Sequence, residues 1–210
     1  MATVKGPLFS LDASGSIGGS VVFSKWKGRN YVRRHAVPAN PNSALQVGTR
    51  AMLRFLSQEW DGLSDAAKLT WATPAEPDNI SAFNAFIRYN MSRWALFKPP
   101  TIEYPATEGN TPGTIGTPVC TAQVKSVLTG FTVSALDDNW GCAIFRKVDS
   151  APGETRAECV RVIPAASAAA FTWTDIDVTV GTDYYYDATP FADDGVWGTE
   201  DQLGNAVPTA

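Results

Sequence analysis

Residues 178–188 read Val178-Thr179-Val180-Gly181-Thr182-Asp183-Tyr184-Tyr185-Tyr186-Asp187-Ala188. Gly181 favours a turn, because glycine adopts backbone angles that other residues avoid. Beyond the turn, Tyr184, Tyr186 and Ala188 share one face of a strand, since successive side chains of a strand point to opposite faces. The pattern predicts a tight corner followed by a strand with a tyrosine-rich inner face.

The same alternation of apolar and polar residues runs through most of the C-terminal half. Turn residues separate the candidate strands, which are Val119–Val124, Gly130–Ala135, Cys142–Val148, Glu158–Ile163, Phe171–Asp175, Asp183–Thr189 and Val196–Leu203. Seven short strands within about 90 residues are typical of a two-sheet sandwich. We therefore predict an all-β sandwich over residues 119–210.

Residues 178–188 resemble the corner and penultimate strand of a fibronectin type III domain, which runs Leu-x-Pro-Gly-Thr-x-Tyr-x-Val at this point. Tyr184 matches the tyrosine-corner position, whose hydroxyl binds back to the backbone of the corner. The resemblance covers roughly residues 99–210. It implies an immunoglobulin-like sandwich, a fold that names no ligand by itself.

The N-terminal half has a different character and is predicted to be α+β. A Gly- and Ser-rich arm extends to about Gly19, and a β-hairpin is expected over Val21–Trp26 and Tyr31–Arg34 because a glycine-containing turn joins two β-prone runs. Helix starts are expected at Asn40-Pro41, at Ser64, and at Asn79 or Ser81, since Asn, Ser and Pro favour the first positions of helices.

Apolar residues at near-helical spacing support these three short helices. They are Leu45, Met52, Phe55, Leu56 and Trp60 in the first helix and Phe83, Phe86, Ile87 and Trp94 in the third. Lys98-Pro99-Pro100 ends the third helix. We predict an attachment domain at residues 1–98, a Pro-rich linker at residues 99–118 and the sandwich at residues 119–210.

One string in the N-terminal half is similar to a loosely characterised group of tailed-bacteriophage proteins. The shared pattern is a Gly-rich start, Trp26-Lys27-Gly28, Val32-Arg33, and then Asn40-Pro41-Asn42-Ser43 with Gln46 and Arg50. The resemblance spans about residues 10–95. Its members are generally regarded as virion structural proteins, so it implies a structural role and other virion proteins as partners.

Charge divides the chain into two halves. Residues 1–98 carry 12 Lys or Arg against 6 Asp or Glu, and residues 99–210 carry 5 against 15, so the net charges are +6 and −10. Such asymmetry indicates two parts with different neighbours. Cys120, Cys142 and Cys159 are odd in number, which argues against a disulfide framework. With no signal peptide or membrane span expected, we predict assembly in the host cytoplasm.

The hairpin carries the candidate partner-binding residues. Trp26, Arg29, Tyr31, Arg33 and Arg34 lie in a segment without acidic residues. Trp, Tyr and Arg dominate protein interfaces because they combine contact area with directed hydrogen bonds. The same cluster is compatible with nucleic acid, which basic and aromatic side chains bind through phosphates and stacked bases.

Other chemistry has weaker support in the sequence. His35 is the only histidine and has no placed nucleophile, so we predict no enzyme, no metal site and no cofactor. The acidic pairs Asp137-Asp138, Asp193-Asp194 and Glu200-Asp201 are expected to be solvated loop charges. A carbohydrate-binding alternative would use Trp140 or Trp197 as an exposed platform, although either residue also suits a core.

The sequence thus predicts a phage virion structural protein that is present in many copies or as a homo-oligomer. Capsid decoration is the first hypothesis, and attachment of the tail or a tail fibre is the second. DNA binding by the basic half is the alternative from another class, and no membrane partner is expected.

Overall fold

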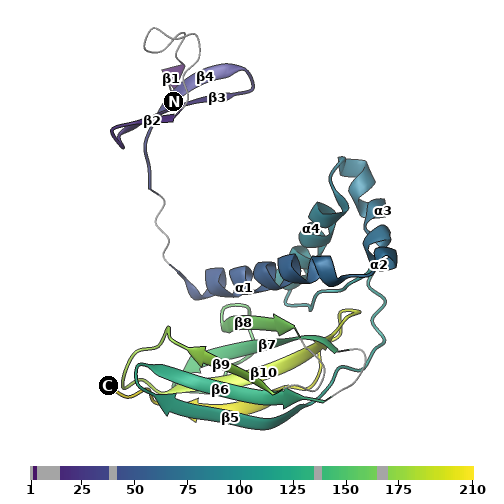
Figure 1. Ribbon diagram of the computed structural model, residues 1–210, viewed down its shortest axis with the longest axis vertical. Helices are drawn as coiled ribbons and strands as arrows, with labels where there is room; N and C mark the ends of the chain where they lie inside the picture. Colours follow the sequence, from purple (N-terminus) through teal and green to yellow (C-terminus); the bar gives the residue numbers. More distant parts are fainter. Residues whose placement is uncertain (1, 4–14, 38–41, 135–138, 165–169) are drawn as a thin grey trace. The chain divides into compact units, whose positions relative to one another are not determined.

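The computed structural model describes residues 2–3, 15–37, 42–134, 139–164 and 170–210 (Figure 1). The chain divides into two compact units, Met1–Pro41 and Asn42–Ala210. Among the described residues, no helix is long and apolar enough to cross a membrane.

The first unit is a four-stranded antiparallel sheet. Its strands are β1 (Ala2–Thr3), β2 (Gly15–Ile17), β3 (Val21–Trp26) and β4 (Arg29–Arg34), in the order β1-β4-β3-β2. Lys27 and Gly28 join β3 to β4 with φ of 48° and 77°, as two-residue hairpin turns require. The predicted hairpin is confirmed. Of the predicted arm, residues 15–17 pair with β3, and residues 4–14 lie outside the described residues.

The second unit begins with a helical layer. Its elements are α1 (Ala44–Glu59), η2 (Trp60–Gly62), α2 (Asp65–Thr70), α3 (Ala72–Ala75), η3 (Glu76–Asp78) and α4 (Ala82–Ala95). The hydroxyls of Ser64 and Ser81 accept hydrogen bonds from the N–H groups of Ala67 and Asn84, at 3.1 and 3.2 Å. Both predicted serine caps are therefore confirmed. Asn40-Pro41 lies outside the described residues, and α1 begins at Ala44 after Ser43.

Two antiparallel sheets follow the helices. One contains β5 (Ile115–Gln123), β6 (Ser126–Val133) and β9 (Phe171–Asp175) in the order β5-β6-β9. The other contains β7 (Asn139–Val148), β8 (Cys159–Pro164), β10 (Tyr184–Ala192) and β11 (Asp201–Ala206) in the order β11-β10-β7-β8. Together with the helices they make an α+β chain that is mostly β.

Side chains from both sheets of the second unit form one apolar core. Val127 and Phe131 from the three-stranded sheet share it with Ile144, Tyr186 and other residues of the four-stranded sheet. A buried polar group also joins the sheets, because Asp175 of β9 accepts hydrogen bonds from Tyr186 Oη at 2.9 Å and Arg146 Nη1 at 2.6 Å. Since an unpaired buried charge is costly, these contacts hold β9 of one sheet against β7 and β10 of the other.

The outer face of the four-stranded sheet packs against the helices. Met52, Phe55 and Leu56 of α1 and Phe86 and Trp94 of α4 share a second apolar core with residues of that sheet, which are Ala143, Phe145, Cys159, Val162 and Phe191. The Phe55 ring lies edge-on to Phe191, with 5.4 Å between centroids. The predicted boundary at residue 98 is therefore corrected, because helices and sheets share a core within one unit.

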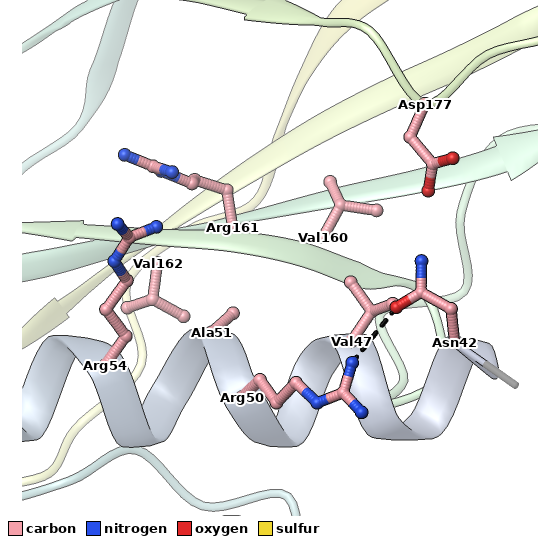
Figure 2. Close-up of a pocket in the computed structure, with 9 residues that line it drawn as sticks. All are labelled: Asn42, Val47, Arg50, Ala51, Arg54, Val160, Arg161, Val162 and Asp177. Atoms are coloured by element: carbon pink, nitrogen blue, oxygen red, sulfur yellow. Dashed lines mark hydrogen bonds between the residues drawn. The ribbon is translucent and has the colours of Figure 1, made fainter. Parts of the chain in front are cut away.

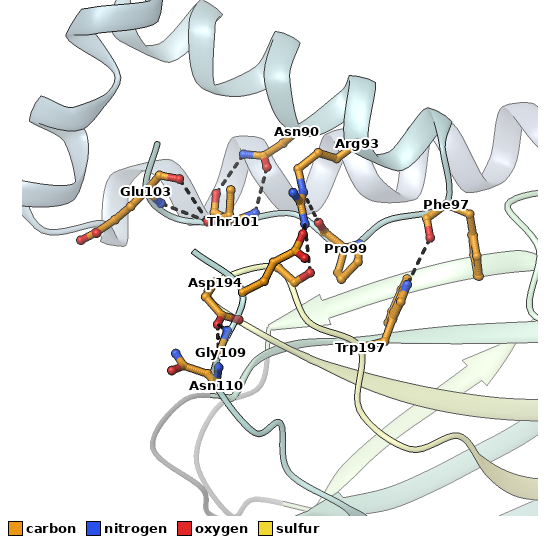
Figure 3. A network of polar contacts seen from close by, with 12 residues as sticks. Asn90, Arg93, Phe97, Pro99, Thr101, Glu103, Gly109, Asn110, Asp194 and Trp197 are labelled. Atoms are coloured by element: carbon orange, nitrogen blue, oxygen red, sulfur yellow. Dashed lines mark hydrogen bonds and ion pairs between the residues drawn. The ribbon is translucent and has the colours of Figure 1, made fainter. Parts of the chain in front are cut away.

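The predicted linker at residues 99–118 is a packed connection (Figure 3). Pro99, Pro100 and Thr101 are buried, and the Asn90 amide donates to the Thr101 carbonyl and accepts from the Thr101 N–H, at 3.0 and 2.8 Å. Arg93 of α4 donates to the carbonyls of Pro99 and Gly195. These bonds tie the connection both to the helices and to the loop after β10, so it does not act as a flexible spacer.

Gly48 sets the distance between α1 and the sheet. A Cβ atom at this position would lie 2.1 Å from the Arg156 carbonyl oxygen and 3.1 Å from that of Cys159. The neighbouring atoms belong to the backbone, so they cannot move aside as a flexible side chain does. Helix and strand therefore approach each other at a point that admits only glycine.

We expect Gly48→Ala to destabilise the second unit by about 1–3 kcal/mol, the range found when a packed site receives an extra methyl group. Helix propensity alone predicts the opposite sign, since alanine favours a helix interior over glycine. Gly62→Ala is the matched control, because nothing lies within 4 Å of a Cβ atom there. Urea unfolding of both variants checks the prediction, and equal stability of the two would contradict it.

Candidate functional site

The hairpin gathers four of the five predicted partner-binding residues on one face. Residues directly opposite each other in an antiparallel pair share a face, and the register pairs Trp26 with Arg29, Ser24 with Tyr31, and Val22 with Arg33. Alternation along each strand puts these three pairs on the same side. We call Trp26, Arg29, Tyr31 and Arg33 the basic-aromatic face.

Arg34 belongs to the opposite face. It pairs with Val21, two residues along the strands from the pair of Phe23 and Val32, and residues two apart share a face. That side of the hairpin also holds the pair of Lys25 and Asn30, so Val21, Phe23 and Val32 lie between polar residues at both ends. The sequence placed all five residues in one site, whereas the register separates Arg34 from the other four.

Neither face of the hairpin is buried. Among the residues of the first unit whose side chains are described, none falls in the buried class, and the Trp26 side chain is 65% exposed. The Lys27 ammonium lies 4.9 Å from the centre of the Trp26 ring, an exposed cation–π contact of about 0.5–1 kcal/mol. Small sheets gain independent stability from an apolar core, and residues 15–37 supply no buried side chain to such a core where their side chains are described.

Charge adds to the binding capacity of the first unit. Residues 1–41 carry 6 Lys or Arg against 1 Asp, while residues 42–210 carry 11 against 20. Arg29, Arg33 and Arg34 are exposed, and within the described residues they form no ion pair. Their guanidinium groups are thus available to carboxylates or phosphates, which the planar fork of arginine binds with two hydrogen bonds.

No nucleophile–base arrangement occurs in the described part of the chain. His35 is exposed, and its backbone N–H donates to the Ser20 carbonyl at 2.8 Å. Burial raises the pKa of the Cys159 thiol to about 12 and that of Cys120 to about 11, so neither is a thiolate at neutral pH. The described residues also contain no group of three His, Cys, Asp or Glu side chains that could hold a metal ion.

The two tryptophans of the carbohydrate-binding alternative are packing residues. The Trp140 ring lies edge-on to Phe55 with 5.0 Å between centroids, and Trp197 Nε1 donates to the Phe97 carbonyl at 3.2 Å. Both are only partly exposed and pack against the core under the helices. The structure therefore gives neither residue the free ring face that stacking on a sugar requires.

One of the acidic pairs is structural. Asp194 is 7% exposed, and its carboxylate accepts hydrogen bonds from the N–H groups of Gly109 and Asn110, the latter at 2.7 Å, so this pair is not a solvated loop charge. Glu200 is exposed, as predicted, and its carboxyl interacts with the buried Asp187. Asp137-Asp138 lies outside the described residues.

Sequence reasoning missed a cluster of three carboxylates, Asp187 within β10 and its neighbours Glu154 and Glu200. Burial, and then the neighbouring Glu200 carboxyl, raise the pKa of Asp187 to about 7. Burial and the charge of Glu200 raise the pKa of Glu154 to about 7, and the Glu154 carboxylate accepts a hydrogen bond from the Thr189 hydroxyl. The carboxylates come from three separate segments of the chain, so no local sequence motif indicates the cluster.

This cluster makes stability depend on pH. Both folded pKa values exceed the ordinary values of about 4 in an unfolded chain, so the folded state binds more protons between about pH 4 and pH 7. The stabilisation that these two protonated carboxyls give the folded state is complete below pH 4 and is lost as pH rises through about 7. We expect Tm to fall between pH 5 and pH 8, and Asp187→Asn to flatten that fall, as checked by thermal unfolding. Asp61→Asn, an exposed carboxylate in η2, is the control; an equal slope in both variants would contradict the assignment.

Comparisons with known proteins leave the family open. No family model and no curated protein matches this chain. One similar solved structure is the sensor domain of the anti-sigma factor RsgI4 in Pseudobacteroides cellulosolvens, with 13% identity, a TM-score of 0.34 and coverage of 49% of this chain and 100% of that one. A likeness at this level carries no argument about function.

Proposed function

We propose that this chain is a structural protein of a phage virion, in which residues 1–41 attach it to the particle and residues 42–210 form the displayed body. The single observation that carries the proposal is the basic-aromatic face, on which Trp26, Arg29 and Arg33 are exposed in a unit with no buried side chain among its described residues. The resemblance of residues 10–95 to tailed-phage proteins supports the same role. Decoration of the capsid is the first choice of place, and a tail or tail-fibre position is the second.

We also propose that the two sheets of the second unit form a fibronectin type III-like sandwich. The order of the strands supports this. β5 and β6 lie in the three-stranded sheet, β7 and β8 in the four-stranded sheet, β9 again in the three-stranded sheet, and β10 and β11 again in the four-stranded sheet. Tyr184 at the start of β10 accepts a hydrogen bond from the Thr179 N–H at 3.0 Å, which is the contact expected of a tyrosine corner. Such a body suits display or spacing.

DNA binding by the first unit is the second candidate, and the exposed arginines beside Trp26 and Tyr31 favour it. It requires affinity that falls steeply with salt, because phosphate contacts release counterions. The acidic second unit would oppose close approach to a polyanion, so we place the virion role first.

Arg33 and Arg34 allow a sharp test, because they are neighbours of equal charge on opposite faces of the hairpin. We expect Trp26→Ala and Arg33→Glu each to weaken attachment by about 2 kcal/mol or more, the loss typical of central interface residues. Arg34→Glu should have a smaller effect. Quantitative mass spectrometry of purified particles measures copies per particle, and cryo-electron microscopy locates them.

The position of the copies separates the two virion roles. Many copies over the head lattice would indicate decoration, whereas few copies at one vertex would indicate the tail. Wild-type incorporation of both the Trp26→Ala and Arg33→Glu variants would contradict attachment through the basic-aromatic face. Absence of the wild-type chain from particles would refute the virion role itself.

A further inference from the structure

A groove in the second unit lies between α1 and β8 (Figure 2). Its floor is apolar and consists of Val47, Ala51, Val160 and Val162, and its volume is about 220 Å³. A second recess of about 480 Å³ shares Asn42, Val47, Val160 and Asp177 with it. Because the two hollows share these lining residues, together they form an elongated groove along the first turns of α1.

Three arginines line the groove, and two of them, Arg54 and Arg161, share one end. Arg50 and Arg54 lie one helical turn apart on α1, and Arg161 projects from β8. Figure 2 shows the guanidinium groups of Arg54 and Arg161 at the same end, with Asp177 at the other. The Arg50 guanidinium donates to the Asn42 side-chain oxygen at 3.1 Å, which directs it along the groove.

The cationic end lacks a balancing carboxylate. Within the described residues, Arg54 and Arg161 form no ion pair, and Asp177 lies 4.0 Å from a different cation, Arg146. The Nε atom of Arg161 is buried and has no hydrogen-bond partner. Buried N–H groups are nearly always paired, so this donor indicates a place for an acceptor that no described residue supplies.

We propose that this groove binds an acidic segment of a partner protein, with one Asp or Glu side chain between Arg54 and Arg161. Carboxylates match the planar fork of arginine, and the valines and Ala51 would cover the aliphatic side chains on either side of the acid. An elongated hollow suits an extended segment better than a free phosphate, which would leave the apolar floor empty.

A nucleic acid fits this groove less well. Residues 42–210 carry 11 Lys or Arg against 20 Asp or Glu, so the unit as a whole repels a polyanion. Asp177 also closes the path of a phosphate backbone along the groove. The groove belongs to the second unit alone, so its binding does not depend on whether the first unit attaches to a virion.

The test uses the full 22.5 kDa chain, labelled with ¹⁵N, and a capped Val-Glu-Val-Glu-Val peptide as the probe. We expect the Arg161 Nε–H signal to shift saturably, and we expect Arg54→Gln or Arg161→Gln to weaken binding about tenfold, as the loss of a charge-assisted hydrogen bond implies. Arg161→Lys keeps the charge without the fork and should be intermediate.

Controls separate this site from general charge attraction. Arg88→Gln is the matched variant, because Arg88 is equally cationic but pairs with Asp78 in the helical layer, and it should bind like the wild type. Equal binding of a Val-Gln-Val-Gln-Val peptide would overturn the proposal. Unchanged affinity of Arg54→Gln, or displacement of the peptide from the same arginines by phosphate or single-stranded DNA, would overturn it too.

Discussion

The close approach of α1 to the backbone before β8 is the contact on which the second unit depends. At Gly48 a single added Cβ atom would lie 2.1 Å from the Arg156 carbonyl oxygen, so the helix can dock only without a side chain there. Docking in turn lets Met52, Phe55 and Leu56 reach the outer face of the four-stranded sheet. Because apolar burial is the main stabilising contribution to folding, losing this approach would expose both surfaces at once.

Docking explains why the four-stranded sheet is buried on both sides. Residues 142–145 of β7 are four consecutive buried positions. Cys142 and Ile144 face the core between the sheets, while Ala143 and Phe145 face the helices. The first unit is the opposite case, since none of its described side chains is buried. The two units thus differ in how far their described side chains are buried.

Local signals predicted the elements well. Alternation located the strands, and serine caps located two helix starts, because both depend on nearby residues. The boundary was wrong because Lys98-Pro99-Pro100 has the composition of a linker, whereas its burial depends on Asn90 and Arg93 of α4. The run from Cys142 to Phe145, apolar without alternation, was the one local sign that a second layer covers this sheet. The groove was not predicted because Arg54 and Arg161 are far apart in the sequence and come together only when α1 docks on the sheet.

Amide hydrogen exchange of the free full-length chain tests the central claim most directly. We predict that α1 and α4 are protected to the same degree as β7 and β10, because residues sharing a core open cooperatively. We also predict that β3 and β4 exchange rapidly until a partner covers the basic-aromatic face. Fast exchange in α1 beside slow exchange in β7 would show that the helices and sheets are separate units, and strong protection of free β3 and β4 would show that the first unit needs no partner.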